Sequence, residues 1–251
     1  MTQTSKTMLK QDYDRYSKED FKVWELLYNR QSEVLPGRAA EEYLSGIKKI
    51  DFVADRIPNY TDMNEKLRNI TGWEVVVVPG LIDNKPFFEY LHNCKFPAST
   101  WLRRLEELDY LEEPDMFHDI YGHVPLLTNQ PFCDFLSGLA GIALKHIENE
   151  WAVEMLSRVY WYTVEFGLIK KDDKLEIYGA GILSSAGESV YSLESDKPAR
   201  VPYDVARLLQ TPYIKDKFQE TYFVINSYEE LYNSLPVIEV ELEKALVAEN
   251  V

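Results

Sequence analysis

The sequence predicts a mainly helical α+β domain, one helical unit with a few short strands. Apolar residues recur at helical spacing through most of the 251 residues, and only brief β-branched runs interrupt them. No regular alternation of strands and helices points to a parallel sheet. The 11 Gly and 12 Pro residues are scattered and do not gather into a linker, so a single domain over residues 1–251 is the simpler interpretation.

The first helix is expected to begin at Ser17, because Ser17 and Asp20 resemble a capping box and apolar residues follow on one face. It should end before residues 35–37, Leu-Pro-Gly. A second helix is predicted from the apolar spacing in residues 40–47. A third, shorter helix is expected over about 62–71, where a glycine follows as a natural stop.

Proline and β-branched residues mark the elements that follow. Pro86 is placed to begin a helix. Longer helices are expected over 131–147 and 151–170, and a short one in the tail, 236–251. Short strands are predicted at residues 73–78, 175–178 and 221–225.

The composition argues against several classes of protein. Lys and Arg number 27 and Asp and Glu 42, so the formal net charge is −15, which disfavours nucleic-acid and membrane-surface partners. The apolar runs are too short to span a membrane, and the N-terminus lacks a signal-peptide core. Two cysteines, Cys94 and Cys133, fit a reducing compartment. We therefore expect a cytoplasmic globular protein.

Two of the four histidines lie close together, His118 and His123. Their i, i+5 spacing differs from the i, i+4 spacing of the HExxH zinc-protease motif. On a regular helix, residues five apart point about 140° away from each other. The two rings converge only if the helix ends between them, and Gly122 and Pro125 favour such an end. The spacing permits a metal site, but it equally allows two ordinary histidines.

Glu165 is the best candidate for a third ligand. It is the single acid in the otherwise uncharged stretch 159–169. Burying a carboxylate there costs several kcal/mol unless it is paired or bound to a metal; Arg158 is the alternative partner. Two His and one carboxylate are the ligands of a non-haem Fe(II) facial triad, and they would also suit a catalytic zinc.

Three segments together resemble the pterin-dependent aromatic amino acid hydroxylases. Residues 113–127 are similar to the family's iron-binding signature, 160–168 to its third-ligand helix, and 178–185, Tyr-Gly-Ala-Gly-Ile-Leu-Ser-Ser, to its substrate-pocket segment. The resemblance runs over about 13–231 and is greatest to the bacterial phenylalanine 4-hydroxylases. It implies a single catalytic domain in a mainly helical fold with a few short strands.

The resemblance implies that His118, His123 and Glu165 hold Fe(II). A tetrahydropterin would supply two electrons while O₂ oxidises the ring of an aromatic amino acid, and no side chain beyond the metal ligands would be catalytic. Two alternatives remain. A zinc-dependent hydrolase would use the same three ligands, and a non-catalytic binding module would tolerate the loss of His118 or Glu165.

The resemblance also implies a pterin site. It is lined by the segment Gly80-Leu81-Ile82, by Phe87 and by Asp119. Phe87 would stack on the pterin ring, although plain core packing is the alternative role for an aromatic residue on a helix. Longer family members have Glu where this chain has the shorter Asp119, which favours a water bridge to the pterin.

For the substrate, the resemblance assigns Arg103 to the amino acid carboxylate, which its planar fork suits. A surface ion pair with nearby acids is the alternative. Gly181 and Ser184 are expected near the substrate and His123, and Pro125 beside the substrate ring. The family's additional Thr contact is replaced by Leu111.

Trp161 bears on the choice of substrate. It precedes Glu165 by one helical turn and is expected to share its face. A Trp at this position resembles the phenylalanine and tyrosine hydroxylases, whereas tryptophan hydroxylases have Phe. We therefore expect L-phenylalanine, with tryptophan hydroxylase as the alternative. The regulatory domain and tetramerisation helix of longer members have no counterpart in this sequence, which predicts a monomer.

Overall fold

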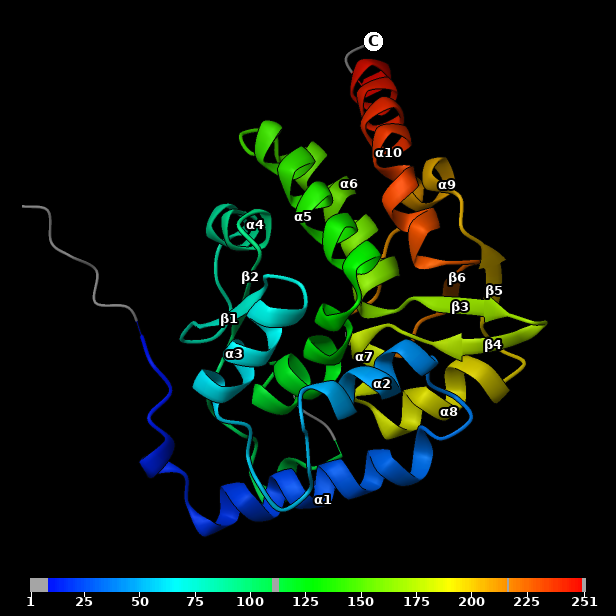
Figure 1. The fold of residues 1–251 in the computed structure, drawn as a ribbon. Helices are drawn as coiled ribbons and strands as arrows, with labels where there is room; N and C mark the ends of the chain where they lie inside the picture. Colours follow the sequence, from blue (N-terminus) through cyan, green and yellow to red (C-terminus); the bar gives the residue numbers. More distant parts are fainter. Residues whose placement is uncertain (1–8, 110–112, 216, 250–251) are drawn as a thin grey trace, which may run out of the picture.

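The N-terminal third of the chain is helical, as predicted, and its first long helix runs along one side of the molecule (Figure 1). The structure, a computed structural model, describes residues 9–109, 113–215 and 217–249. Ser17 and Asp20 cap each other's backbone N–H groups at the start of this helix, so the predicted capping box is confirmed. The elements are η1 (Tyr13–Arg15), α1 (Lys18–Val34), α2 (Glu41–Lys49) and α3 (Tyr60–Ile70). The start of α3 lies two residues earlier than expected because Asn59 caps it.

A small parallel sheet follows, which the sequence did not predict. The strands β1 (Glu74–Val77) and β2 (Lys95–Ala98) pair in parallel. The helix α4 (Asn84–His92) connects them, with Pro86 in its first turn as expected. The expectation that no parallel pairing occurs is therefore wrong. The strand β2 escaped notice because its sequence, Lys-Phe-Pro-Ala, has no β-branched residue.

The second sheet has the strand order β4-β3-β6-β5. Its strands are β3 (Leu168–Lys171), β4 (Lys174–Ile177), β5 (Ala199–Pro202) and β6 (Thr221–Ile225). The central strand β3 pairs antiparallel with β4 and parallel with β6, and β5 also pairs parallel with β6. The predicted strands near 175 and 221 are confirmed. The predicted helix to residue 170 is wrong, because the chain leaves the helix after Glu165 to enter β3.

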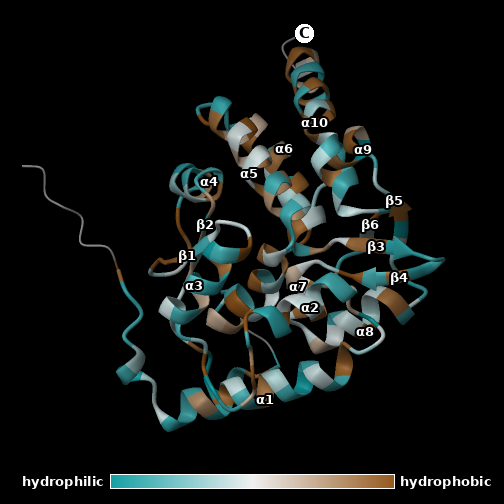
Figure 2. Cartoon of the chain, in the orientation of Figure 1, coloured by the Kyte–Doolittle hydropathy of each residue, from teal (hydrophilic) through white to brown (hydrophobic). Residues whose placement is uncertain are grey.

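Helices pack beside this sheet and complete the mainly helical fold (Figure 1). They are α5 (Gln130–Lys145), α6 (Glu150–Tyr160), α7 (Ala180–Leu183), α8 (Ala186–Glu194), α9 (Val205–Gln210) and α10 (Tyr228–Glu249). The last helix is longer than the predicted tail helix, since it continues through Pro236. The helix packs against the protein through its buried Ile238 and Leu242 and through Leu235, which contacts Gly138 of α5. Figure 2 shows hydrophilic and hydrophobic residues interleaved along α1 and α10, as expected for helices with one buried face.

Aromatic side chains fill the core next to the histidine segment. Phe117 stacks on Tyr121 with ring centroids 4.6 Å apart, and Trp24 of α1 meets Phe117 edge-on at 5.5 Å. Trp24 is itself fixed by a hydrogen bond from its indole to the carbonyl of Val53. Within the part of the chain that the structure describes, no helix is long and apolar enough to cross a membrane.

Candidate metal centre

The two histidines converge because the segment that carries them is a π-helix. This turn, η3 (Phe117–His123), follows the i→i+5 hydrogen-bond pattern, which places residues five apart on one face. The expectation that the helix ends between the histidines is therefore wrong. Gly122 is required here, since a Cβ would lie 2.9 Å from the carbonyl oxygen of Ala180. Pro125 follows in the 3₁₀ turn η4 (Val124–Thr128).

The predicted third ligand also lies on a π-helical turn. This turn, η5 (Trp161–Glu165), continues α6, and the N–H of Phe166 donates to the carbonyl of Trp161 at 2.9 Å. It turns the carboxylate of Glu165 toward the histidines. Arg158, the alternative partner, instead contacts Glu154 and the carbonyl of Leu209.

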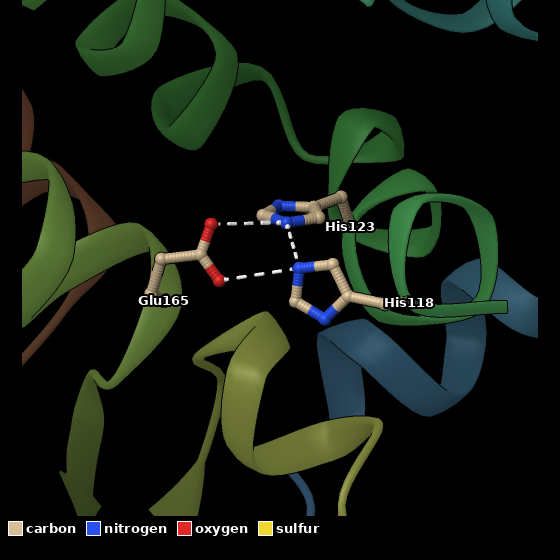
Figure 3. A group of neighbouring side chains, drawn as sticks. All are labelled: His118, His123 and Glu165. Carbon is tan, nitrogen blue, oxygen red and sulfur yellow. Dashed lines mark hydrogen bonds and ion pairs between the residues drawn. The ribbon is translucent and has the colours of Figure 1, made fainter. Parts of the chain in front are cut away.

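Figure 3 shows the three side chains pointing at a common centre. The Nε2 atoms of His118 and His123 are 3.2 Å apart. The two carboxylate oxygens of Glu165 lie 3.6 Å from Nε2 of His118 and 3.2 Å from Nε2 of His123. One ligand atom from each residue lies within 4.8 Å of the others. The sequence-predicted triad is thus assembled in space.

Burial shifts the pKa of His118, and neighbouring groups shift that of Glu165. It lowers the pKa of His118 to about 4, so this imidazole is neutral at pH 7. Burial alone would raise the pKa of Glu165, but His123, then His118 and the Tyr160 hydroxyl, lower it to about 2. A neutral imidazole and an ionised carboxylate are the forms that bind a metal ion.

Ser184 fixes the tautomer of His118. Its hydroxyl donates to the carbonyl of Ala180 at 2.8 Å and lies 2.9 Å from Nδ1 of His118. Because the hydroxyl proton is used on the carbonyl, Nδ1 must carry the proton that joins these two atoms. Nε2 then presents its lone pair to the centre, as a metal ligand requires. The hydrogen-bond partner of Ser184 is therefore His118, whose Nε2 lies 3.2 Å from that of His123.

These atoms fit a divalent metal. The lone pair of His118 Nε2 faces a second imidazole nitrogen and a carboxylate, an arrangement of acceptors that a cation between them would stabilise. Three protein ligands leave coordination positions for other molecules. The donor atoms by themselves suit both Fe(II) and Zn(II).

The residues expected to bind a pterin come from the loop before α4, from α4 itself and from the histidine segment. Gly80, Leu81 and Ile82 form the loop between β1 and α4, where Leu81 is 72% exposed. Phe87 on α4 meets the ring of Tyr160 edge-on at 5.3 Å, and the hydroxyl of Tyr160 bonds to Glu165.

Asp119, the remaining pterin candidate, is held by a backbone hydrogen bond. It accepts the N–H of Ser99 at 2.7 Å. Burial raises the pKa of Asp119 to about 6, although the Ser99 N–H partly opposes this shift.

Arg103 lies beside the histidine segment in a buried ion pair. Its Nε and Nη2 atoms each donate at 2.9 Å to the two oxygens of Asp115. Asp115 also accepts the backbone N–H of His118 at 3.1 Å, so the pair is tied to the first ligand. A surface ion pair was the predicted alternative for Arg103, whereas its partner is the buried Asp115, only three residues before His118 and not predicted from the sequence.

Aromatic rings surround the turn that carries Glu165, which we call the glutamate side of the centre; the segment with His118 and His123 is the histidine side. Trp161 stacks on Tyr213 with centroids 4.5 Å apart and lies 5.0 Å from Phe166. Gly181 allows close packing here, since a Cβ would lie 2.8 Å from the Phe166 ring. Tyr213 was not among the residues predicted from the sequence.

Of the remaining substrate candidates, Pro125 is buried beside α2. Its carbonyl oxygen would be 2.1 Å from a Cβ at Gly46. Pro125 therefore contributes to packing against α2 beside the triad. Leu111, which replaces the family's Thr contact, lies outside the described residues.

Comparisons with known proteins identify what this chain is similar to. A sequence model described as biopterin-dependent aromatic amino acid hydroxylase matches residues 8–249. The phenylalanine-4-hydroxylase of Chromobacterium violaceum is 50% identical over 228 residues, which cover 90% of this chain and 76% of the relative. The phenylalanine-4-hydroxylase of Caulobacter vibrioides is 43% identical over 226 residues, 88% of this chain and 75% of the relative.

Solved structures agree with the fold. The crystal structure of the C. violaceum enzyme with bound oxidised Fe(III) superposes with a TM-score of 0.92 at 48% identity, covering 96% of this chain and 87% of that one. A structure of the same enzyme with iron(III) and 7,8-dihydrobiopterin gives a TM-score of 0.90 at 48% identity, over 95% and 87% of the two chains. The mainly helical fold predicted from the sequence is confirmed.

Proposed function

The chain belongs to the biopterin-dependent aromatic amino acid hydroxylases, and from this we propose that it converts L-phenylalanine to L-tyrosine with O₂ and a tetrahydropterin. His118, His123 and Glu165 hold the Fe(II). The observation that carries the proposal is the convergence of these three side chains on one centre. Relatives that are close to half identical over nine-tenths of the chain are phenylalanine-4-hydroxylases, and one of them binds iron.

The residues of this chain prepare the centre for that reaction. Bound iron and a reduced pterin supply the oxygen activation and the electrons. Ser184 keeps the lone pair of His118 Nε2 directed at the metal. Glu165 supplies one negative charge, so the site retains a net positive charge with a divalent ion. With three protein ligands, open positions remain for O₂ and water.

Arg103 receives the carboxylate of the amino acid. Asp115 engages Nε and Nη2, which holds the guanidinium plane in place and leaves Nη1 to donate to a substrate. The guanidinium is linked through Asp115 to the backbone of His118. A carboxylate bound there would lie on the histidine side of the site.

The aromatic wall on the glutamate side favours a phenyl ring. Trp161 stacks on Tyr213 and packs against the tilted ring of Phe166, and its own indole would reduce the space for an indole substrate. With Trp161, we assign Gly181, Ser184 and Pro125 to the substrate pocket. The pterin is assigned to Gly80-Leu81-Ile82, Phe87 and Asp119, with Phe87 supplying a ring for stacking.

We also propose that residues 1–251 act as one catalytic domain and as a cytoplasmic monomer. The helix α10 packs on α5 of its own chain through Leu235 and Gly138, which supports a self-contained unit. Sedimentation equilibrium of the metal-loaded protein tests the monomer directly.

The decisive experiment varies metal, pterin and substrate together. Metal-stripped protein is incubated with phenylalanine, tetrahydrobiopterin and O₂, with Fe(II) or Zn(II) added, and tyrosine is detected by chromatography. We expect tyrosine only when Fe(II) and the pterin are both present. Preferential formation of 5-hydroxytryptophan from tryptophan would keep the chemistry and overturn the substrate. If the metal-loaded protein hydroxylates no aromatic amino acid, the proposal fails and a zinc-dependent hydrolase becomes the better candidate.

A further inference from the structure

A buried glutamine lies behind the tryptophan wall of the substrate pocket. Gln219 is 1% exposed and precedes β6. Its Oε1 accepts the indole N–H of Trp161 at 3.2 Å and the backbone N–H of Ile214 at 3.4 Å. Its Nε2 donates to the carbonyl of Ile214 at 2.7 Å. One amide group therefore joins the tryptophan to Ile214, the residue next to Tyr213.

The backbone of Gln219 is anchored from the opposite side. Its N–H donates at 3.1 Å to Oε1 of Glu188, which lies on α8. The same carboxylate oxygen accepts the hydroxyl of Tyr222 at 2.7 Å. Glu188 is 5% exposed, so this anchor lies inside the protein and is not a surface contact. The side-chain amide of Gln219 thus starts from a fixed backbone position.

Ring contacts alone do not fix the orientation of Trp161. Its two ring neighbours are Tyr213, whose plane is tilted by 25°, and Phe166, tilted by 35°. Near-parallel faces attract without a strong preference for rotation within the ring plane. A directional hydrogen bond at Nε1 supplies that preference. Since Gln219 also holds Ile214, it fixes the residue beside Tyr213 as well.

Only an amide satisfies this set of partners. Oε1 accepts two N–H groups while Nε2 donates to a carbonyl. An apolar side chain of similar length would leave the indole N–H and the Ile214 carbonyl without a buried partner, and such groups are costly to leave unpaired. The indole would then reorient to recover a hydrogen bond elsewhere.

We propose that Gln219 is a positioning residue that orients Trp161 and thereby sets the preference of the pocket for a phenyl over an indole substrate. The specificity part rests on the proposed function, because it assigns Trp161 to the substrate pocket. The positioning part concerns only the hydrogen bond between two side chains of this chain.

The first test is spectroscopic and needs neither metal nor turnover. The chain has five tryptophans, so a ¹H–¹⁵N correlation spectrum should show five indole signals, and Trp161→Phe identifies the one from Trp161. In Gln219→Met that signal should move upfield and exchange faster with water. The signal of Trp24, whose indole donates to the carbonyl of Val53 at 2.9 Å, should stay in place and report that the variant is folded.

The matched control is Gln130→Met, the same substitution at an exposed glutamine on α5 that contacts Asp134. It should leave all five signals unchanged. An unmoved Trp161 signal in folded Gln219→Met would overturn the positioning role, as would an equal shift in the Gln130 control.

The second test measures the ratio of kcat/KM for phenylalanine to that for tryptophan. We expect Gln219→Met to lower this ratio about 3- to 10-fold, the worth of one hydrogen bond. Adding Gln219→Met to Trp161→Phe should lower it no further, since the N–H that Gln219 holds is then gone. An unchanged ratio in Gln219→Met would overturn the specificity role. If the parent protein hydroxylates no amino acid, the proposed function fails, whereas the spectrum still decides whether Gln219 orients Trp161.

Discussion

Two buried carboxylates support the metal centre from outside. Asp115 is hydrogen-bonded to the segment that carries the histidines, and Glu188 is linked through Gln219 to Trp161 on the turn that carries Glu165. The two differ in whether their partner is charged. Asp115 supports the histidine side and is fully buried, but it faces the guanidinium of Arg103. Glu188 supports the glutamate side and is 5% exposed, yet it accepts hydrogen bonds only from uncharged groups, a tyrosine hydroxyl and a backbone N–H, among the described residues.

The difference in partners reverses the effect of burial on the pKa. Burial alone would raise the pKa of both groups. The ion pair with Arg103 nevertheless holds the pKa of Asp115 below its usual value. Burial raises the pKa of Glu188 to about 7, because the hydrogen bonds from Tyr222 and Gln219 oppose it only in part. The histidine side thus has a permanently charged support, and the support of the tryptophan wall titrates near neutral pH.

The largest effect is expected from breaking the charged support. Asp115→Asn leaves the guanidinium of Arg103 buried without its counter-charge, which should lower the free energy of unfolding by about 3–5 kcal/mol. Urea denaturation at pH 7 measures this. The control is Glu106→Gln, because Glu106 and Arg104 form an exposed pair at 3.6 Å whose loss should cost less than about 1 kcal/mol. A loss at Asp115 no larger than that of the control would contradict the distinction.

The raised pKa of Glu188 should make the free energy of unfolding depend on pH. Glu188 binds its proton more tightly in the folded state, so the folded protein loses stability as pH rises from about 4.5, the usual value, to about 7. At 1.36 kcal/mol for each pH unit, this loss is about 3 kcal/mol over the whole window. Glu188→Gln should remove it.

Unfolding free energies of wild type and Glu188→Gln at pH 4 and pH 8 provide the measurement. From pH 4 to pH 8 the free energy of unfolding should fall more for the wild type than for Glu188→Gln. Glu243→Gln, at an exposed position on α10, is the control and should track the wild type. Parallel pH profiles for Glu188→Gln and wild type would mean that the pKa of Glu188 is the same in the folded and unfolded states. The support from Asp115 runs in the opposite sense and is lost only as pH falls below about 4.

Whether a feature could be predicted from the sequence depends on how far apart its residues lie in the chain. Local signals succeeded: the capping box at Ser17, the β-branched run before Pro79 and the isolated acid Glu165 each report on their own neighbourhood. The support from Glu188 through Gln219 to Trp161, by contrast, depends on residues far apart in the chain. Gln219 stands 58 residues after Trp161 and 31 after Glu188, and no local pattern marks a buried amide.

The π-helical turns were missed for a related reason. A period of i→i+5 is adopted where tertiary packing stabilises it, here where Gly122 approaches the carbonyl of Ala180. Sequence reasoning therefore found the three ligands, partly through a family resemblance, but gave the wrong local geometry for the histidines. Likewise β2 and β5 are only four residues long, and each is defined by its partner strand.

A smaller effect is expected at the hydroxyl that orients the first ligand. Ser184→Ala removes the acceptor for Nδ1 of His118, which should weaken metal binding about 10- to 100-fold. Competition with a metal chelator measures the affinity. Ser189→Ala is the matched control, because Ser189 makes the same bond to the carbonyl four residues earlier but touches no ligand. Equal affinities for the two variants would show that the serine does not fix the tautomer.

The smallest effect is expected on substrate preference, from replacing Trp161, which Glu188 supports through Gln219. Trp161→Phe shortens a half-buried ring that stacks on Tyr213, and the added space should favour an indole substrate. A change of this size in a pocket is worth about 1–3 kcal/mol, so the kcat/KM ratio of tryptophan to phenylalanine should rise at least about tenfold. Trp101→Phe, at a tryptophan that is 37% exposed, should leave the ratio unchanged. Because Asp115 stays paired with Arg103 in this variant, binding of the substrate carboxylate should be retained. A large rise in KM for both amino acids would instead mean that Trp161 also positions Arg103 or the histidines.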